Sequence, residues 1–293
     1  MGTDFAPNGM PIFPIYWRND DGFNANGDTQ GDSRLEFLAP ADGDYVVRVT
    51  DATGRGGEAY AYRLLLRSLE PDFRVFAGPA RVNVARDGRV PIDVRVLRQD
   101  GFDGEVRVQF HDLPPGITID PDVIPAGEDL VRLALTAGPG AQSSPVTARF
   151  RLTAESSVDG QIVTRESAIG PITVGEVPPD LTVSTDTSQL ALAPGKSTAL
   201  TVKLDRFNGF SSRVPIEVLN LPFGVRVMNT GLNGILVREG EKERTVELYA
   251  EPWVHDMDRT IYVQAQIETQ SPLKPLFLGS PVKLAIAKSI AKN

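Results

Sequence analysis

The sequence predicts an all-β protein built from tandem antiparallel β-sandwiches, and three observations lead to this prediction. Short runs of Val, Ile and Thr alternate with polar residues, the period-two pattern of a strand with one buried face. Turn-forming residues, 27 Gly and 23 Pro, divide these runs at intervals of roughly ten residues. Hydrophobic residues make up 41% of the 293 residues, which is enough for two or three domain cores.

The tandem arrangement follows from an internal repeat, which a constant offset of 108 positions reveals. Three short motifs of the first copy recur in the second at this spacing. The pairs are Pro71-Asp72-Phe73 with Pro179-Asp180-Leu181, Gly101-Phe102 with Gly209-Phe210, and Leu113-Pro114-Pro115-Gly116-Ile117 with Leu221-Pro222-Phe223-Gly224-Val225. Three anchors at one spacing predict two copies of one structural module.

The runs between these anchors alternate in both copies. The apolar positions are Val90, Ile92, Val94 and Val96, then Val106, Val108 and Phe110, then Val146, Ala148, Phe150 and Leu152 in the first copy; the second has Leu200, Val202 and Leu204, then Val214, Ile216 and Val218, then Ile261, Val263, Ala265 and Ile267. About seven such runs in each copy are typical of an immunoglobulin-like sandwich. The chain has no cysteine, so the likeness to antibody domains is architectural only.

The Leu-Pro-x-Gly motif is interpreted as a structural turn at the end of a strand. Proline fixes φ and cannot donate to a β-ladder, so it ends the preceding strand. The glycine two positions later permits a positive φ. We expect the leucine to close one end of each core.

Residues 32–66 carry a different pattern. Leu35 and Phe37 are expected on one strand, and Val47 and Val49 on the next, with a turn at Ala39-Pro40-Ala41-Asp42-Gly43-Asp44-Tyr45 between them. Asp51, a Gly-rich turn over 54–57 and Tyr60-x-Tyr62-x-Leu64 follow. Together these elements resemble the bacterial pre-peptidase C-terminal domain.

That resemblance implies a small, non-catalytic, jelly-roll-like sandwich attached to secreted bacterial proteins, often proteases. Some members bind calcium and a fibrous protein substrate. The match begins only near residue 32, so we expect residues 1–69 to lack some of their sheet partners and the chain to be a fragment of a larger protein. The expected domains are a partial sandwich over 1–69 and two immunoglobulin-like sandwiches over 71–176 and 179–290, joined by Pro-stiffened linkers into a semi-rigid rod.

The candidate metal site is an acidic, Asn-rich segment over residues 19–28. Calcium takes six to eight oxygen ligands, which clustered carboxylates and amides supply. The candidate ligands are Asp20, Asp21, Asn24, Asn26 and Asp28. The spacing does not fit an EF-hand loop, and a solvated turn is the simpler alternative. Calcium is therefore the one candidate cofactor.

Trp17 and Trp253 are the candidate ligand-binding residues, as exposed platforms on which a sugar could stack. Burial as core anchors is the alternative. No catalytic residue is predicted. The two histidines, His111 and His255, have no metal-ligand partner at a useful spacing, and no Gly-x-Ser-x-Gly motif is present.

Composition limits the possible partners. The formal net charge is −8, and residues 1–70 carry 11 acidic and 6 basic side chains, so a nucleic-acid footprint is not predicted. No apolar run reaches the ~20 residues of a membrane-spanning helix. The leading hypothesis is a non-catalytic extracellular or envelope module that acts as a spacer, anchor or adhesion unit, joined to upstream domains of the same chain. The alternative is a binding module for polysaccharide or fibrous protein, with or without a requirement for calcium, attached to a secreted hydrolase.

Overall fold

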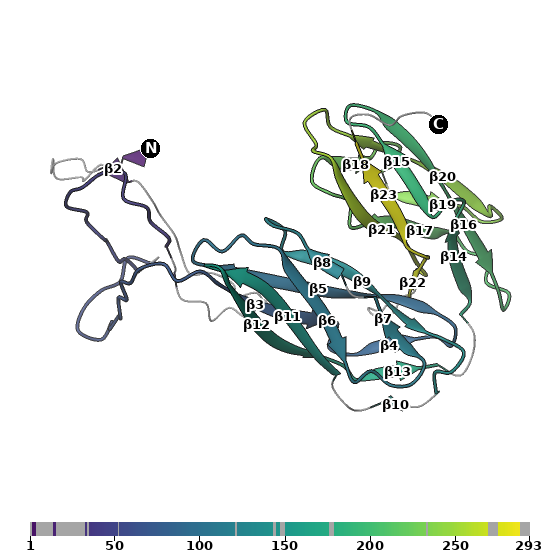
Figure 1. The fold of residues 1–293 in the computed structure, drawn as a ribbon, viewed down its shortest axis with the longest axis horizontal. Helices are drawn as coiled ribbons and strands as arrows, with labels where there is room; N and C mark the ends of the chain where they lie inside the picture. The colour runs from purple at the N-terminus through teal and green to yellow at the C-terminus, as the bar shows by residue number, and fades with distance from the viewer. Residues whose placement is uncertain are drawn as a thin grey trace. The chain divides into compact units, whose positions relative to one another are not determined.

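The computed structural model describes residues 2–3, 14–15, 33, 35–51, 53–120, 122–142, 145–146, 150–175, 179–232, 234–268 and 275–287. Every helix or strand assigned within these ranges is a β-strand (Figure 1). The predicted all-β class is therefore confirmed. The same part of the chain contains no helix with the length and apolar character that a membrane crossing requires.

The chain divides into two compact units. The first comprises residues 1–73 together with 98–102, and the second comprises residues 74–97 and 103–293. The first unit contains a short antiparallel pair, β1 (Gly2–Thr3) with β2 (Pro14–Ile15). Its remaining described residues up to 71 form no strand.

The strands predicted around Leu35 and Phe37, and around Val47 and Val49, are therefore not formed. The alternation that suggested them is real, but alternation stabilises a strand only when a neighbouring strand pairs with its backbone. The predicted turn between them is present as bends over residues 40–43. The Tyr45 hydroxyl donates to the Ala41 carbonyl at 2.5 Å, and the Phe37 and Tyr45 rings meet edge to face at 4.9 Å.

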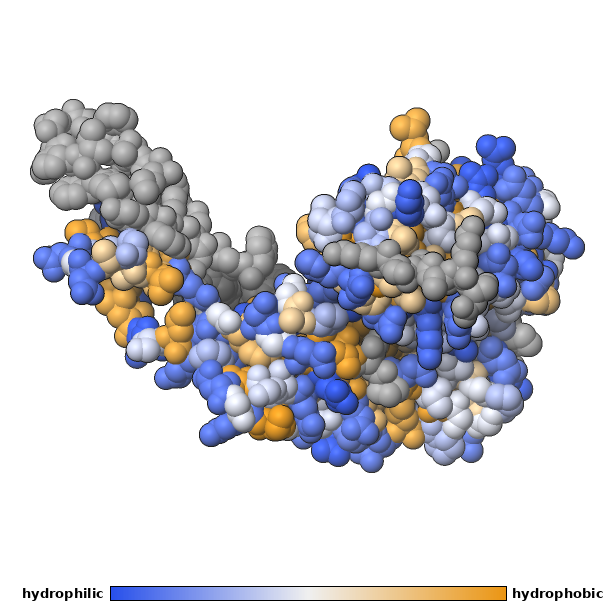
Figure 2. All heavy atoms as spheres, turned by 45° about the horizontal axis from the view of Figure 1, so that its top comes forward, coloured by the Kyte–Doolittle hydropathy of each residue, from blue (hydrophilic) through white to orange (hydrophobic). Residues whose placement is uncertain are grey.

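Hydrophobic side chains gather on the surface of this first unit, as the orange spheres at the left of Figure 2 show. The exposed members are Leu35, Leu38, Tyr45, Val46, Val47, Val49, Tyr60, Tyr62, Leu64, Leu65, Leu66 and Leu69. The apolar side chains of this segment thus face solvent.

Asp100 organises the other end of the same unit. Its buried carboxylate forms an ion pair with Arg67 at 2.5 Å and accepts a hydrogen bond from the Glu70 backbone at 3.2 Å. The Phe73 and Phe102 rings stack beside it, with centroids 5.1 Å apart. The Gly-Phe motif of the first copy therefore serves as an aromatic anchor.

Residues 72–174 form one group of strands, drawn in blue to teal in Figure 1. The strands are β3 (Asp72–Gly78), β4 (Val82–Val84), β5 (Arg89–Gln99), β6 (Val106–His111), β7 (Ile117–Ile119), β8 (Asp122–Ile124), β9 (Leu130–Ala137), β10 (Pro145–Val146), β11 (Phe150–Val158), β12 (Gln161–Ile169) and β13 (Ile172–Val174). They form sheets in the orders β3-β5-β9-β7, β12-β11-β6-β8 and β10-β13-β4.

Residues 181–286 form the second group, drawn in green to yellow. The strands are β14 (Leu181–Thr185), β15 (Gln189–Leu192), β16 (Ser197–Arg206), β17 (Val214–Leu219), β18 (Val225–Val227), β19 (Ile235–Val237), β20 (Glu243–Ala250), β21 (Met257–Gln266), β22 (Leu276–Leu278) and β23 (Val282–Ile286). The sheets run β14-β16-β20-β18 and β15-β23-β21-β17-β19, with β22 also paired to β21.

The two groups share the topology of one four-stranded sheet. The order β3-β5-β9-β7 corresponds strand for strand to β14-β16-β20-β18. Pairing is antiparallel except for one parallel pair in each group, β4 with β13 and β15 with β23. The sequence did not predict these parallel pairs, because alternation shows which face of a strand is buried but not which neighbour it pairs with.

Most of the predicted core positions are buried in both sandwiches, but Phe110 is only half-buried, and the side chains of Val146 and Ala148 lie outside the described residues. Ile92 and Val94 are fully buried in the first, and Leu200 and Val202 in the second. Intervening residues of these strands lie at or near the surface. The period-two prediction is confirmed here, because each strand of a sandwich has one face on the core and one toward water.

Candidate functional site: the junction between the two sandwiches

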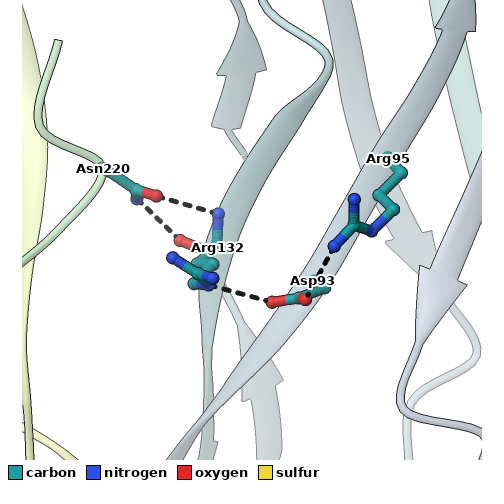
Figure 3. Close-up of polar contacts among 4 residues, drawn as sticks. All are labelled: Asp93, Arg95, Arg132 and Asn220. Carbon is teal, nitrogen blue, oxygen red and sulfur yellow. Dashed lines mark hydrogen bonds and ion pairs between the residues drawn. The ribbon is translucent and has the colours of Figure 1, made fainter.

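Asn220 joins the second sandwich to the first through a pair of hydrogen bonds. Its carboxamide oxygen accepts from the Arg132 backbone N–H at 2.9 Å, and its amide nitrogen donates to the Arg132 carbonyl at 2.8 Å (Figure 3). Strand β7 pairs with Leu135 and Ala137 of β9, and Asn220 supplies equivalent groups further along this strand. The side chain thus acts as a one-residue strand partner, since a carboxamide carries the same donor and acceptor as a peptide group.

The Arg132 side chain continues this polar contact into the first sandwich. Its Nε lies 3.2 Å from Asp93 Oδ1 on the neighbouring strand β5, and Arg95 lies 3.8 Å from the other oxygen of Asp93 (Figure 3). These groups are partly exposed, so the ion pairs add little stability by themselves. They do orient the Arg132 side chain away from the Asn220 hydrogen bonds.

Two further polar contacts link the same sandwiches. Arg259 of β21 is ion-paired with Glu128, which precedes β9. Arg89 of β5 donates to the Ser280 hydroxyl at 3.1 Å through Nη1, and to Thr136 at 3.0 Å through Nε. The side chain of Arg259 is almost fully buried, which strengthens its pairing relative to a surface pair.

An apolar cluster completes the junction. It combines Ala134 of the first sandwich with Leu219, Tyr262 and Leu278 of the second. Tyr262 is the largest of the four and is only 2% exposed. A buried aromatic ring surrounded by polar contacts is the usual anatomy of a specific interface.

The local fold explains why Asn220 reaches this position. It precedes Leu221-Pro222 and has a φ of +61°, in the left-handed region that Asn and Asp tolerate best. The equivalent residue of the first copy, Asp112, has a φ of +56°. Both copies therefore place a left-handed residue here, but the Asn220 amide can both donate and accept, whereas the Asp112 carboxylate can only accept. In the sequence, the only sign of the Asn220 contact is that Asp112 of the first copy is replaced by Asn in the second. Aligning the two copies reveals this difference, but its meaning becomes clear only from the hydrogen bonds to Arg132.

Trp253 is the one predicted ligand-binding residue that the structure describes, and it is 53% exposed. It lies in the loop after β20, with its ring centroid 5.2 Å from that of Phe223. Trp17 and the proposed calcium ligands Asp20, Asp21, Asn24, Asn26 and Asp28 lie outside the described residues. Within the described ranges, no group of three or more His, Cys, Asp or Glu side chains is placed to hold a metal ion.

The two histidines occupy different settings. His111 ends β6, and its Nε2 lies 2.8 Å from the Thr153 hydroxyl on β11. His255 is exposed in the loop before β21. The structure thus separates them by sandwich, one in each module, in agreement with their interpretation as independent residues.

Asp51 caps the Gly-rich turn of the first unit. Its carboxylate accepts from the Thr53 hydroxyl, from the Thr53 backbone at 2.9 Å and from the Arg55 backbone at 3.2 Å. The hydrogen bond from the Thr53 side chain has the largest effect on Asp51, followed by those from the two backbone N–H groups. Because all three favour the charged carboxylate, the pKa of Asp51 lies below its ordinary value of 3.8. The carboxylate stabilises this turn above the ordinary pKa, and that contribution is lost as the pH falls through the lowered value.

We therefore expect Asp51 to titrate below pH 3.8 when its carboxyl carbon is followed by NMR. Thr53→Ala removes the hydroxyl donor and should raise the midpoint toward the ordinary value. A midpoint at or above 3.8, or one that Thr53→Ala leaves unchanged, would contradict this account of the turn.

Comparison with known proteins identifies no family. No protein-family model matches the chain, and no curated protein matches it. The resemblance of residues 32–66 to the pre-peptidase C-terminal domain therefore stays a prediction.

Solved structures do show similarities, and the three that follow have low TM-scores. The fibronectin(III)-like modules of Clostridium thermocellum CbhA share 16% identity at a TM-score of 0.23, over 73% of this chain and 93% of theirs. A protein of unknown function from Porphyromonas gingivalis W83 shares 12% at 0.26, over 72% and 98%. Domains 4–9 of the surface layer protein SbsC share 12% at 0.27, over 75% of this chain and 32% of that one. At these scores the similarities support no conclusion, and the assignment of tandem β-sandwiches rests on the sheets themselves.

Proposed function

We propose that the two sandwiches act together as a non-catalytic structural spacer that holds its two ends at a fixed separation and orientation. The observation that carries this proposal is the pairing of the Asn220 carboxamide with both backbone groups of Arg132. A flexible tether would leave the facing residues of its two modules solvated. Here the facing residues are hydrogen-bonded, ion-paired and, at Tyr262, buried.

The energetics favour one arrangement of the sandwiches over many. Separating them would expose Tyr262 and Leu278 and leave Arg259 without Glu128. Burying one large side chain contributes roughly 1.5–3 kcal/mol, and each hydrogen bond adds about 1 kcal/mol. A population of separated modules of a few per cent or less is the expected consequence.

The rest of the proposal concerns location and partners. An extracellular or envelope location, and attachment to further domains, follow from the resemblance of residues 32–66 and stay proposals. Binding of a calcium ion by residues 19–28 is likewise a proposal.

Electron paramagnetic resonance tests the spacer role, since it measures the distribution of distances between two spin labels. The chain has no cysteine, so labels can be placed by Gln109→Cys on β6 and Lys203→Cys on β16 without removing native thiols. Both positions are exposed and lie within strands, so the protein backbone that carries each spin label is held in place by its sheet. We expect one narrow distance distribution for the full chain.

A further inference from the structure

The loop that carries Trp253 has a counterpart in the first sandwich. The segments Ala137-Gly138-Pro139-Gly140-Ala141 and Ala250-Glu251-Pro252-Trp253-Val254 follow the equivalent strands β9 and β20. In the first copy Gly138 donates to the Gly116 carbonyl at 2.8 Å, and in the second Glu251 donates to the Gly224 carbonyl at 2.9 Å. Each loop thus docks on the glycine of its own Leu-Pro-x-Gly motif.

The remaining hydrogen bonds of the two loops also correspond. Ala141 donates to the Gly138 carbonyl at 2.9 Å, and Val254 donates to the Glu251 carbonyl at 3.1 Å. The scaffold is therefore the same in both copies. This scaffold needs no aromatic side chain, because the first copy has Pro115 and Gly140 where the second copy has Phe223 and Trp253.

The second copy places Phe223 and Trp253 at these two positions, and both rings are largely in water. Phe223 is 84% exposed and Trp253 is 53% exposed, with 45° between the ring planes. One edge of the indole rests on the backbone of Gly224, where an added Cβ would lie 2.5 Å from Trp253 Cη2. The indole thus packs against Gly224 along one edge, and about half of its surface stays in contact with solvent.

The two exposed rings are adjacent and the scaffold does not require them, so together they form a small apolar patch that a binding partner can cover. The pair is too small for a stable protein interface, which buries roughly 800 Å² on each partner. To bind a single strand of nucleic acid, the protein would need unpaired Lys or Arg side chains facing the phosphate backbone. The nearby cation, Arg226, is already ion-paired with Glu251 and lies 5.1 Å from the centre of the Tyr249 ring.

A pyranose sugar fits these constraints. Its axial C–H groups present a weakly positive, apolar face to the negative face of an aromatic ring. Its hydroxyls can exchange hydrogen bonds with polar groups at the rim, and Arg226 and Glu251 lie within three residues of the aromatic pair along the chain. The formal net charge of −8 disfavours acidic polymers.

We propose that Phe223 and Trp253 form a stacking platform for a neutral polysaccharide of pyranose units. The platform is independent of the spacer role, because it lies on one sandwich and uses none of the junction residues. It belongs to the second copy alone, which carries the aromatic rings.

Affinity electrophoresis of the full chain tests this platform. The protein migrates through native gels at pH 8 that contain barley β-glucan, xyloglucan or galactomannan, with polygalacturonate as the acidic comparison. At least one neutral polymer should retard the chain, and polygalacturonate should not. Trp253→Gly and Phe223→Pro introduce the residues of the first copy, so both variants should fold and should weaken retardation at least about tenfold.

Phe207→Ala is the matched control, because Phe207 is an exposed aromatic residue elsewhere on the same sandwich. It should bind like the unaltered chain. The platform is ruled out if no neutral polymer retards the protein, or if Phe207→Ala loses as much affinity as Trp253→Gly. Concentration-dependent self-association that Trp253→Gly abolishes, without sugar binding, would identify a second copy as the occupant and also overturn the proposal.

Discussion

Replacing Gly116 with alanine is expected to lower the free energy of unfolding by about 3 kcal/mol or more. Two effects add at this position. The backbone φ is +79°, which costs an L-residue about 1–2 kcal/mol. In addition, the new Cβ would overlap the Ala141 nitrogen and the Gly140 carbonyl carbon of the docked loop. Both clashing groups are backbone atoms, so no side-chain rotation can relieve them.

Gly101→Ala is the control that separates these effects. Gly101 has a φ of +78°, but an added Cβ there would meet nothing within 4 Å. It should therefore cost only the backbone strain, about 1–2 kcal/mol. Urea unfolding of the two variants measures the difference. Equal losses would show that the loop does not dock on Gly116, and would remove the basis for matching the two loops.

The second large effect is expected at Asn220. Asn220→Gly keeps the left-handed backbone, since glycine adopts a φ of +61° without strain, but it removes both hydrogen bonds to Arg132. Leaving a partly buried N–H and carbonyl unpaired should cost about 2 kcal/mol. The Arg132 amide should also exchange its hydrogen at least about tenfold faster.

Two other variants sharpen this prediction. Asn220→Asp keeps an acceptor for the Arg132 N–H but loses the donor, and it places a carboxylate against the Arg132 carbonyl, so it should not restore stability. Asn208→Gly is the control: Asn208 has a similar φ of +53°, but its amide donates to Asp180 within its own sandwich. It should leave Arg132 exchange unchanged. If the Arg132 amide exchanges at the same rate in Asn220→Gly and in the unaltered chain, Asn220 does not clamp the junction.

The sandwiches themselves could be predicted from the sequence, because strand alternation and turn chemistry are local. Val94 and Val202 are buried where the period-two pattern puts them, and both Leu-Pro-x-Gly motifs end strands. The same reasoning was wrong at Leu35 and Val47, where the pattern is equally regular. Strand formation there depends on a partner strand, which a single segment does not encode.

The junction could not be predicted because its signal is split between distant residues. Asn220 and Arg132 are 88 positions apart, and each looks ordinary in its own surroundings. Trp253 is an intermediate case. Its residue type predicted a possible ligand contact, but exposure and the neighbouring Phe223 became visible only with the fold.

The distance distribution between spin labels at positions 109 and 203 tests the central claim most directly. If Asn220 and Tyr262 hold the sandwiches as one body, the full chain should give a single narrow distribution. Asn220→Gly should broaden it, while Asn208→Gly should not. A broad distribution in the unaltered chain, or identical widths with and without the Asn220 carboxamide, would contradict a fixed spacer.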